Sequence, residues 1–343
     1  MVKIDLITGF LGSGKTTFIR EYAKYLLEKG EKICIIENDY GAVNIDMVLL
    51  QDLYGENCNL EMIVGGDGQE AHRRRFRTKL ISMGMSGYTR VIIEPSGIYD
   101  VDEFFDVLYD EPLDRWYEIG NVISIVDAEL VRDGRLEGMS RYLFMSEIAC
   151  AGKIVISKLI GKAGAKGEND SEGQNVITKK ESIKNSINNI MAEFGLWKTA
   201  SENDIIPWFN PEKDFIAKPF DEISKEDFDK ISTCGYRHSS YVKLPLEDKQ
   251  FTPLFYFDVE ISEEKLREIA SDLFKDNKAG RIIRIKGFVK TGDNTQIEIN
   301  ATEKEIKLNP VNSSRNVIII IGEELNKDHI NEIWKDYCKV VSL

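Results

Sequence analysis

The chain has 343 residues, with 58 acidic and 45 basic side chains, so its formal net charge is -13. A chain of this length predicts about two domains. The acidic balance disfavours nonspecific binding of nucleic acid or of an anionic membrane, because both need a positive surface, so we expect neither among its partners.

Cysteine, histidine and apolar residues give no sign of a disulfide framework, a local metal cluster or a membrane segment. The five cysteines are scattered without a CxxC or CxC pair, which favours reduced, structural thiols, and the three histidines lie far apart. The chain enters a strand-like run without a basic and then apolar leader, and no apolar run approaches the roughly 20 residues that span a bilayer. We expect a cytoplasmic protein.

The first element, a β-strand over residues 2–7, leads into a complete GxxxxGK(S/T) motif, ITGFLGSGKTT, which a helical pattern follows. Glycines at these positions let backbone amides point at phosphate oxygens, while the lysine supplies a cation and the threonine hydroxyl can bind Mg²⁺. The helix N-terminus adds a dipole that favours anions. The predicted phosphate-binding residues are Gly9, Gly12, Ser13, Gly14, Lys15, Thr16 and Thr17.

A second strand, residues 32–36, is followed by the polar segment Glu37, Asn38 and Asp39. Ligands bind at the carboxyl ends of the strands in open parallel α/β sheets, so Glu37 or Asp39 could reach a phosphate-bound Mg²⁺. Turn formation and helix capping by Asn38 and Asp39 are the alternative, and the residues alone do not decide between the two.

Basic residues gather around Phe76 in the segment AHRRRFRTKLI, where a helix would place Arg73 and Arg77 on one face. Such a patch in an acidic chain could contact a nucleotide phosphate or an acidic partner. A solvated helix face is the other interpretation, and basic runs are more often of that kind.

The next strand, residues 91–93, delivers Glu94 to the same edge of the sheet, and Gly97 follows closely. An acid at this position suits the Mg²⁺ or the attacking water of a P-loop enzyme, and the backbone N–H of Gly97 could meet the γ-phosphate. The predicted catalytic residues are Lys15 and Glu94, and the predicted Mg²⁺ ligands are Thr16, Glu94 and Asp39.

Further strands over residues 122–126 and 153–156 alternate with helical stretches, which predicts an α/β domain with a doubly wound, mostly parallel sheet. The glycine-rich segment 161–174 predicts a mobile loop, and a helix over 183–194 completes the layer. Residues 211–237 contain Pro, Asp and Lys with only short apolar runs between them, which predicts a linker.

Beyond the linker, short strands alternate with turns, and two helices are predicted near residues 262–274 and 327–337. This pattern predicts a smaller α+β domain with a largely antiparallel sheet, in which we recognise no catalytic constellation and expect a docking role. The predicted strands are 239–244, 254–259, 281–289, 295–299, 305–308 and 316–321. The predicted domains are 1–210 and 238–343, joined by the linker 211–237.

In this order the motifs resemble those of the CobW-like P-loop GTPases, relatives of the urease and hydrogenase nickel-insertion GTPases and of the chaperones of cobalamin enzymes. The resemblance runs nearly end to end. It rests on ITGFLGSGKTT, IENDYGAVNID, VIIEPSG, SIVDA and, near the C-terminus, GRIIRIKGFV. It implies a doubly wound GTPase domain, an acid of EPSG at the Walker B position, and a C-terminal domain that contacts a client protein.

One departure from the family pattern concerns metal. Where the family carries GCxCC, whose thiolates suit a soft metal ion, residues 65–69 are GGDGQ, and the acid of the family's ENEFGE falls on Ala42. The loss of thiols and carboxylate together argues against a carried transition metal. Cys58 and His72 are the nearest substitutes in the sequence.

The second departure concerns the base. The family's (N/T/S)KxD loop uses its Asp to bind guanine, whereas this strand ends in SKLI, with Ser157 and Lys158 beside the base. Lys158 can lay its stem over a purine, but selectivity for guanine needs the paired acceptor. GTP is the family inference, and ATP or relaxed specificity stays open. Acids that could act from elsewhere are Glu168, Asp170 and Asp204.

We expect a slow nucleoside triphosphatase that uses Mg²⁺ with GTP or ATP and acts as a switch, its hydrolysis relaxing the segments near Asp39 and Gly97. The resemblance implies a metalloprotein or corrinoid-protein client. A metallochaperone GTPase that itself carries Zn, Ni or Co and a small-molecule kinase are the alternatives, and a homo-oligomer stays open.

Overall fold

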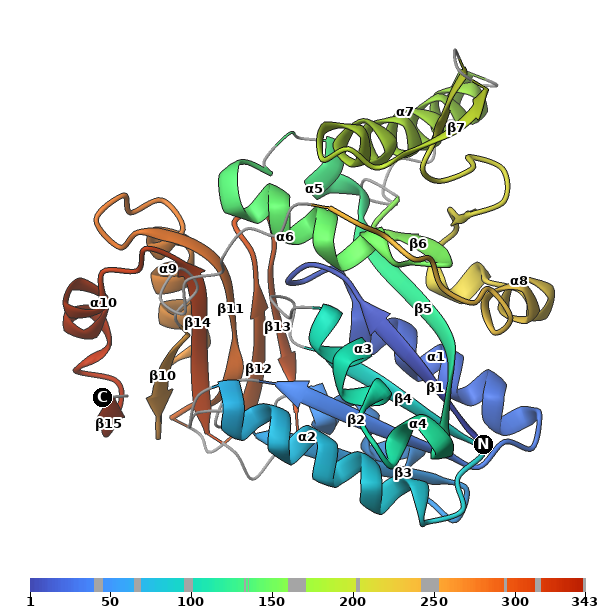
Figure 1. Ribbon diagram of the computed structural model, residues 1–343. Coiled ribbons are helices and arrows are strands. Elements are labelled where there is room, and N and C mark those ends of the chain that lie inside the picture. The colour runs from blue at the N-terminus through green and yellow to red at the C-terminus, as the bar shows by residue number, and fades with distance from the viewer. Residues whose placement is uncertain are drawn as a thin grey trace. The chain divides into compact units, whose positions relative to one another are not determined.

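The computed structural model describes residues 1–39, 46–64, 69–95, 101–132, 134, 136–159, 171–201, 204–241, 253–292, 295–311 and 316–341. It divides into two compact units, the first made of Met1–Ala42 and Leu49–Leu244 and the second of Val43–Val48 and Pro245–Leu343. Figure 1 labels most of the helices and strands of both.

The first unit is built on a seven-stranded sheet in the order β3-β2-β4-β1-β5-β6-β9, and all its neighbouring strands run parallel. Figure 1 labels the first six of these strands. Strands β4 and β6 are buried along their whole length, as expected where helices cover both faces of a parallel sheet. The predicted mostly parallel α/β fold is therefore confirmed. The strands are β1 Val2–Thr8, β2 Ile33–Asp39, β3 Cys58–Val64, β4 Arg90–Pro95, β5 Tyr117–Asp127, β6 Lys153–Ser157 and β9 Phe215–Ile216.

Helices connect these parallel strands, and a short antiparallel hairpin of β7 (Trp197–Ser201) and β8 (Asp204–Pro207) follows the longest of them. That helix, α7, begins at Ser171, so residues 171–174 of the predicted loop are helical, while 161–170 lie outside the described residues. The helices are α1 Lys15–Glu28, α2 Gln69–Gly84, α3 Val101–Tyr109, α4 Leu113–Trp116, α5 Ala128–Arg132, α6 Gly138–Ala149, α7 Ser171–Glu193 and α8 Lys225–Ile231, with the 3-10 helix η2 Phe220–Glu222. A further 3-10 helix, η1 Asp46–Leu53, belongs to the second unit up to Val48 and to the first from Leu49.

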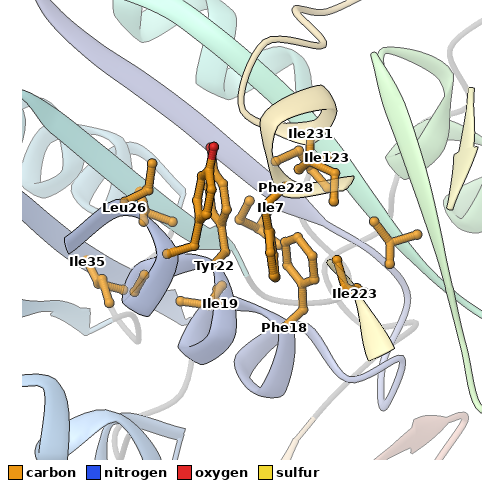
Figure 2. Packing of buried hydrophobic residues seen from close by; sticks show 14 of the residues in the cluster. Ile7, Phe18, Ile19, Tyr22, Leu26, Ile35, Ile123, Ile223, Phe228 and Ile231 are labelled. Carbon is orange, nitrogen blue, oxygen red and sulfur yellow. The ribbon is translucent and has the colours of Figure 1, made fainter. Parts of the chain in front are cut away.

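The core of the first unit lies where α1 packs between the sheet and α8. Figure 2 shows Phe228 of α8 facing Phe18 and Tyr22 of α1, with ring centroids 6.3 and 6.2 Å apart. Sheet residues such as Ile7 and Ile123 complete the same cluster. Large apolar side chains from the helix, the sheet and α8 thus fix the start of α1, which follows directly on the glycine-rich loop.

Residues 211–237, predicted as a linker, are instead part of the first unit. Strand β9 pairs with β6 through Ile154 with Phe215 and Val155 with Ile216, and α8 buries Phe228 against α1. The strand has two residues and the helix seven, and elements this short show no hydrophobic period in a sequence. Residues 211–237 therefore pair and pack within the first unit.

The second unit holds a six-stranded sheet in the order β13-β12-β11-β14-β10-β15, whose neighbouring strands are antiparallel. Its core includes stacked rings of Tyr256 and Trp334, with centroids 5.4 Å apart. The predicted antiparallel α+β architecture is confirmed. Its elements are β10 Leu254–Phe257, α9 Glu263–Leu273, β11 Arg281–Lys290, β12 Gln296–Ala301, β13 Ile306–Pro310, β14 Val317–Glu323, α10 Lys327–Trp334 and β15 Val340–Val341.

One predicted strand of this second half, residues 239–244, is described only over its first three residues. Residues 239–241 have no regular secondary structure, and 242–244 lie outside the described residues. Across the part of the chain that the structure describes, no helix combines the length and the apolar character needed to cross a membrane.

Candidate functional site

The loop between β1 and α1 has a backbone that only glycine adopts readily. Gly9, Gly12 and Gly14 have φ angles of 139°, 76° and 98°, which L side chains rarely adopt. A Cβ on Gly9 would lie 2.3 Å from the carbonyl oxygen of Ile125. The loop therefore curls tightly against β5 before Gly14 begins α1 as its N-cap residue.

Lys15, the first residue of α1, folds back along this loop. Its Nζ donates a hydrogen bond of 2.7 Å to the carbonyl oxygen of Gly9, and the side chain is largely buried. The ammonium thus lies in the curl of the loop, where a P-loop lysine meets phosphate oxygens. Thr17, two residues on, is exposed on the first turn of α1.

Thr16 and Glu94 are brought together from separate elements. The Thr16 hydroxyl donates a hydrogen bond of 2.9 Å to Oε1 of Glu94, at the end of β4. Glu37 of β2 pairs in register with Glu94, and residues paired in this way on parallel strands point to the same face. A hydroxyl and two buried carboxylates form a set of hard oxygen ligands, which fits Mg²⁺ better than a soft metal ion.

Two predicted site residues cannot be placed. Asp39 is the last residue of β2, but its side chain lies outside what the structure describes, and so does all of Gly97. The strand ends that carry them, β2 and β4, are neighbours in the sheet. Among the acids considered for the base, Glu168 and Asp170 also lie outside the described residues, as does the side chain of Asp204.

The end of β6 also reaches the glycine-rich loop. Oγ of Ser157 donates a hydrogen bond of 2.6 Å to the carbonyl oxygen of Ser13. Lys158 follows with a left-handed φ of 52°, and its Nζ lies 2.7 Å from Oδ2 of Asp127, the last residue of β5. Sequence reasoning did not include Asp127 in the site, although its position at a strand end was a usable signal.

Two arginines in the basic segment of α2 bind the residues that follow α3. Nη2 of Arg73 lies 3.4 Å from Oδ2 of Asp110, and Nη2 of Arg77 donates to the carbonyl oxygen of Glu111. These two arginines, predicted either to bind phosphate or to be solvated, join α2 to the segment that follows α3.

For a transition metal, the described residues offer little. Among them, no three His, Cys, Asp or Glu side chains gather closely enough to hold a metal ion. Cys58 and His72 are both buried, and burial raises the pKa of the Cys58 thiol to about 11, so the thiolate that a soft metal needs is scarce at neutral pH. Residues 65–68 and Ala42 lie outside the described part of the chain.

Glu147 of α6 was missed by sequence reasoning. Its side chain is buried, and within the described structure neither carboxyl oxygen has a hydrogen-bond partner. Burial raises the pKa of Glu147, and the charge of Lys15 opposes this shift. The usable signal was an acid in the apolar end of a helix, directly before Ile148.

Two known domains match the chain. The CobW/HypB/UreG nucleotide-binding domain matches residues 3–183, and the C-terminal domain of the cobalamin synthesis protein cobW matches residues 253–338. The zinc chaperone YeiR of Escherichia coli (strain K12) is 31% identical over 159 residues, which are 46% of this chain and 47% of that protein. The zinc chaperone YjiA of the same organism is 27% identical over 165 residues, 46% of this chain and 49% of that protein. The chain thus spans about half the length of these relatives.

Solved structures with a similar course include the Zn(II)-bound YjiA GTPase from E. coli, at a TM-score of 0.35 and 15% identity, covering 98% of this chain and 99% of that one. The hydrogenase maturation factor HypB from Archaeoglobus fulgidus has a TM-score of 0.38 and 18% identity, covering 67% of this chain and 87% of its own. On its two domain matches, the chain belongs to the CobW/HypB/UreG family.

Proposed function

We propose that this protein is a slow nucleoside triphosphatase whose bound nucleotide controls its grip on a client protein. The phosphates bind in the loop Gly9–Thr17, and Thr16 and Glu94, with Asp39 or Glu37, hold Mg²⁺. When bound, Mg²⁺ neutralises charge that develops on the phosphates. The single observation that supports this best is the hydrogen bond of 2.9 Å between Thr16 and Glu94, because it places a metal-binding hydroxyl beside a carboxylate from another element.

The side chains of the loop have distinct roles in this proposal. Lys15 exchanges its hydrogen bond with the Gly9 carbonyl for one with the terminal phosphates, whose charge it offsets. Ser157 holds the loop from the side through the Ser13 carbonyl. Glu94 orients the attacking water by accepting a hydrogen bond from it. The segments after β2 and β4 respond to loss of the γ-phosphate, as switch segments do.

We further propose GTP as the natural nucleotide, with ATP as the alternative, and a metalloprotein or corrinoid protein as the client. Membership of the family supports GTP, whereas the SKLI segment lacks the acid that would select guanine. The match to the cobW C-terminal domain supports a client of this class, and the second unit, with its own sheet and core, is the part proposed to dock to it.

The test is release of phosphate from GTP and from ATP in the presence of Mg²⁺. Lys15→Ala and Glu94→Gln are expected to lower kcat by roughly a hundredfold or more while the protein stays folded, because each removes a group that acts on the phosphates or the water. Lys24→Ala on the same helix and Glu118→Gln on β5 are the matched controls, since both residues lie outside the site. Near-normal turnover in either site variant would refute the assignment.

A metallochaperone that carries the ion itself is the second candidate, favoured by the names of the relatives YeiR and YjiA, both zinc chaperones. Equilibrium dialysis with Zn²⁺, Ni²⁺ or Co²⁺ separates the two. Stoichiometric binding that tightens with nucleotide supports the carrier, and binding that is absent with and without nucleotide supports the switch. The phosphate-release assay also tests a small-molecule kinase, which releases little phosphate without an acceptor.

A further inference from the structure

Strand β9 carries the chain to the edge of the sheet that holds the proposed site. It is parallel to β6, with Ile154 opposite Phe215 and Val155 opposite Ile216. Because the two strands are parallel, residues 217–219 leave β9 toward the same edge of the sheet at which β6 ends in Ser157, next to the loop that we propose for the base. The residues that follow β9 are thus the next ones along this edge beyond Ser157 and Lys158.

From there the chain turns back toward the glycine-rich loop through η2, whose first residue is Phe220. Ring atoms Cε2 and Cζ of Phe220 lie 3.3 and 3.6 Å from the point where a Cβ on Gly14 would be. The same ring meets that of Phe18 edge-on, with centroids 5.9 Å apart and planes at 62°. Phe220 therefore touches both the last glycine of the loop and the first turn of α1.

Contacts on both sides hold this turn in place. Nζ of Lys218 donates to Oδ2 of Asp227, 2.5 Å away, and Asp227 forms a capping box with Ser224 at the start of α8. These contacts flank Phe220 and order the turn that carries it before any ligand binds. An ordered turn loses little conformational entropy on binding, which favours affinity.

Unlike its neighbours, the ring of Phe220 is only partly buried. Phe18 and Phe228 lie inside the core cluster, whereas Phe220 packs on its border. We propose that Phe220 is the surface on which the purine base of the bound nucleotide stacks. An aromatic ring stacks on any base, so Phe220 adds affinity without choosing between guanine and adenine, which fits a chain whose SKLI segment lacks the selecting acid. This inference rests on the proposed function, because it assigns a role within the same site.

Steady-state hydrolysis of GTP and of ATP by Phe220→Leu tests the assignment. Stacking is made equally in the ground and transition states, so KM is expected to rise at least about fivefold for both nucleotides while kcat stays within about twofold. Phe228→Leu is the matched control, since it removes a ring from the same cluster; it is expected to lower stability and leave KM unchanged.

An unchanged KM would overturn the assignment. A rise in KM accompanied by a fall in kcat would also overturn it, because Phe220 would then act by shaping the loop. A wild-type chain that neither binds nor hydrolyses nucleotide would instead overturn the proposed function. If Phe220→Leu does not fold, fluorescence of Phe220→Trp decides. A change with MgGDP and none with magnesium tripolyphosphate supports stacking, and equal responses, or none, count against it.

Discussion

In the middle of β1, the carboxylate of Asp5 accepts four hydrogen bonds, whereas at the carboxyl-terminal end of the same strand the hydroxyl of Thr8 has no partner among the residues described. The donors to Asp5 are Nη1 of Arg90 at 2.6 Å, the hydroxyl of Tyr22 at 2.8 Å, and the backbone and side-chain nitrogens of Asn121, each at 2.9 Å. We call these four residues the Asp5 cluster. Its members are drawn from three strands and one helix, so it joins elements far apart in the sequence.

The carboxyl-terminal end of the sheet holds a second group of buried polar side chains, which lack partners among the described residues. Thr8 pairs in register with Ser124 of β5, and Asn38 is the penultimate residue of β2. The members of this unpartnered group are Thr8, Asn38 and Ser124 on the strands, with Glu147 of helix α6, which feels the charge of Lys15.

The two groups of buried polar residues differ in whether they stabilise the fold or serve function. A buried polar group without a partner costs stability, and proteins retain such groups mainly where function needs them. The Asp5 cluster lies between α1 and the inner parts of the strands, before the point where β1 reaches the glycine-rich loop, and stabilises the fold. Three members of the unpartnered group, Thr8, Asn38 and Ser124, lie toward the carboxyl ends of their strands, where β1 and β2 lead into the proposed site. Removing polar atoms should therefore have opposite effects in the two groups.

The largest effect is expected for Arg90→Met in the Asp5 cluster. It leaves the Asp5 carboxylate buried without its counter-charge, so the free energy of unfolding should fall by about 3–5 kcal/mol. Urea denaturation measures the change. Arg115→Met, which breaks the exposed ion pair with Glu111, should cost about 1 kcal/mol or less. A loss for Arg90→Met no greater than that of the control would show that the cluster does not stabilise the fold.

The elements of the site that the sequence predicted are those in which local residues carry the signal. The glycines and Lys15 lie in one continuous motif, and Glu94 stands near the end of an apolar strand, so spacing alone nominated them as site residues. The Asp5 cluster could not be predicted in this way, because Asp5 and Arg90 are 85 residues apart and only the sheet order brings them together. A lone acid in an apolar strand indicates that some partner exists without saying which.

The neighbourhood of Phe220 was missed for a different reason. β9 has two residues, and the ring reaches Gly14 only because that strand joins the sheet beside β6. The spacing of residues in a motif predicts only contacts within one loop. Contacts between segments some 200 residues apart depend instead on tertiary packing, which overrides local propensity.

An intermediate effect, dependent on pH, is expected for Glu147→Gln in the unpartnered group. Burial raises the pKa of Glu147 in the folded state, so the folded protein holds this proton more tightly than the unfolded chain does. Stability is then lost as pH rises from the unfolded-state pKa through the folded-state one. Glutamine stays neutral, so the gain in melting temperature from Glu147→Gln should grow between pH 5 and pH 8. Lys15 favours the charged form and limits the gain.

Melting curves of the wild type and of Glu147→Gln at pH 5, 6, 7 and 8 measure this difference. Glu118 is an exposed glutamate on β5, so Glu118→Gln is the control. The difference in melting temperature between this variant and the wild type should be the same at all four pH values. If the difference in melting temperature between Glu147→Gln and the wild type is also independent of pH, the carboxyl group of Glu147 has the same pKa in the folded and unfolded chains.

The smallest effects, and the sharpest test of the comparison, come from deleting one hydroxyl in each of the two groups. Tyr22→Phe removes a donor to Asp5 and should lower the free energy of unfolding by about 1–2 kcal/mol, since a hydrogen bond to a charged group is lost. Thr8→Val keeps the shape of the side chain but removes a buried hydroxyl with no described partner, and should raise the free energy of unfolding by about 1 kcal/mol or less. Urea denaturation under identical conditions measures both. If the two changes have the same sign, the two groups do not differ in the way that we infer, because only a hydroxyl without a partner can be removed at a gain.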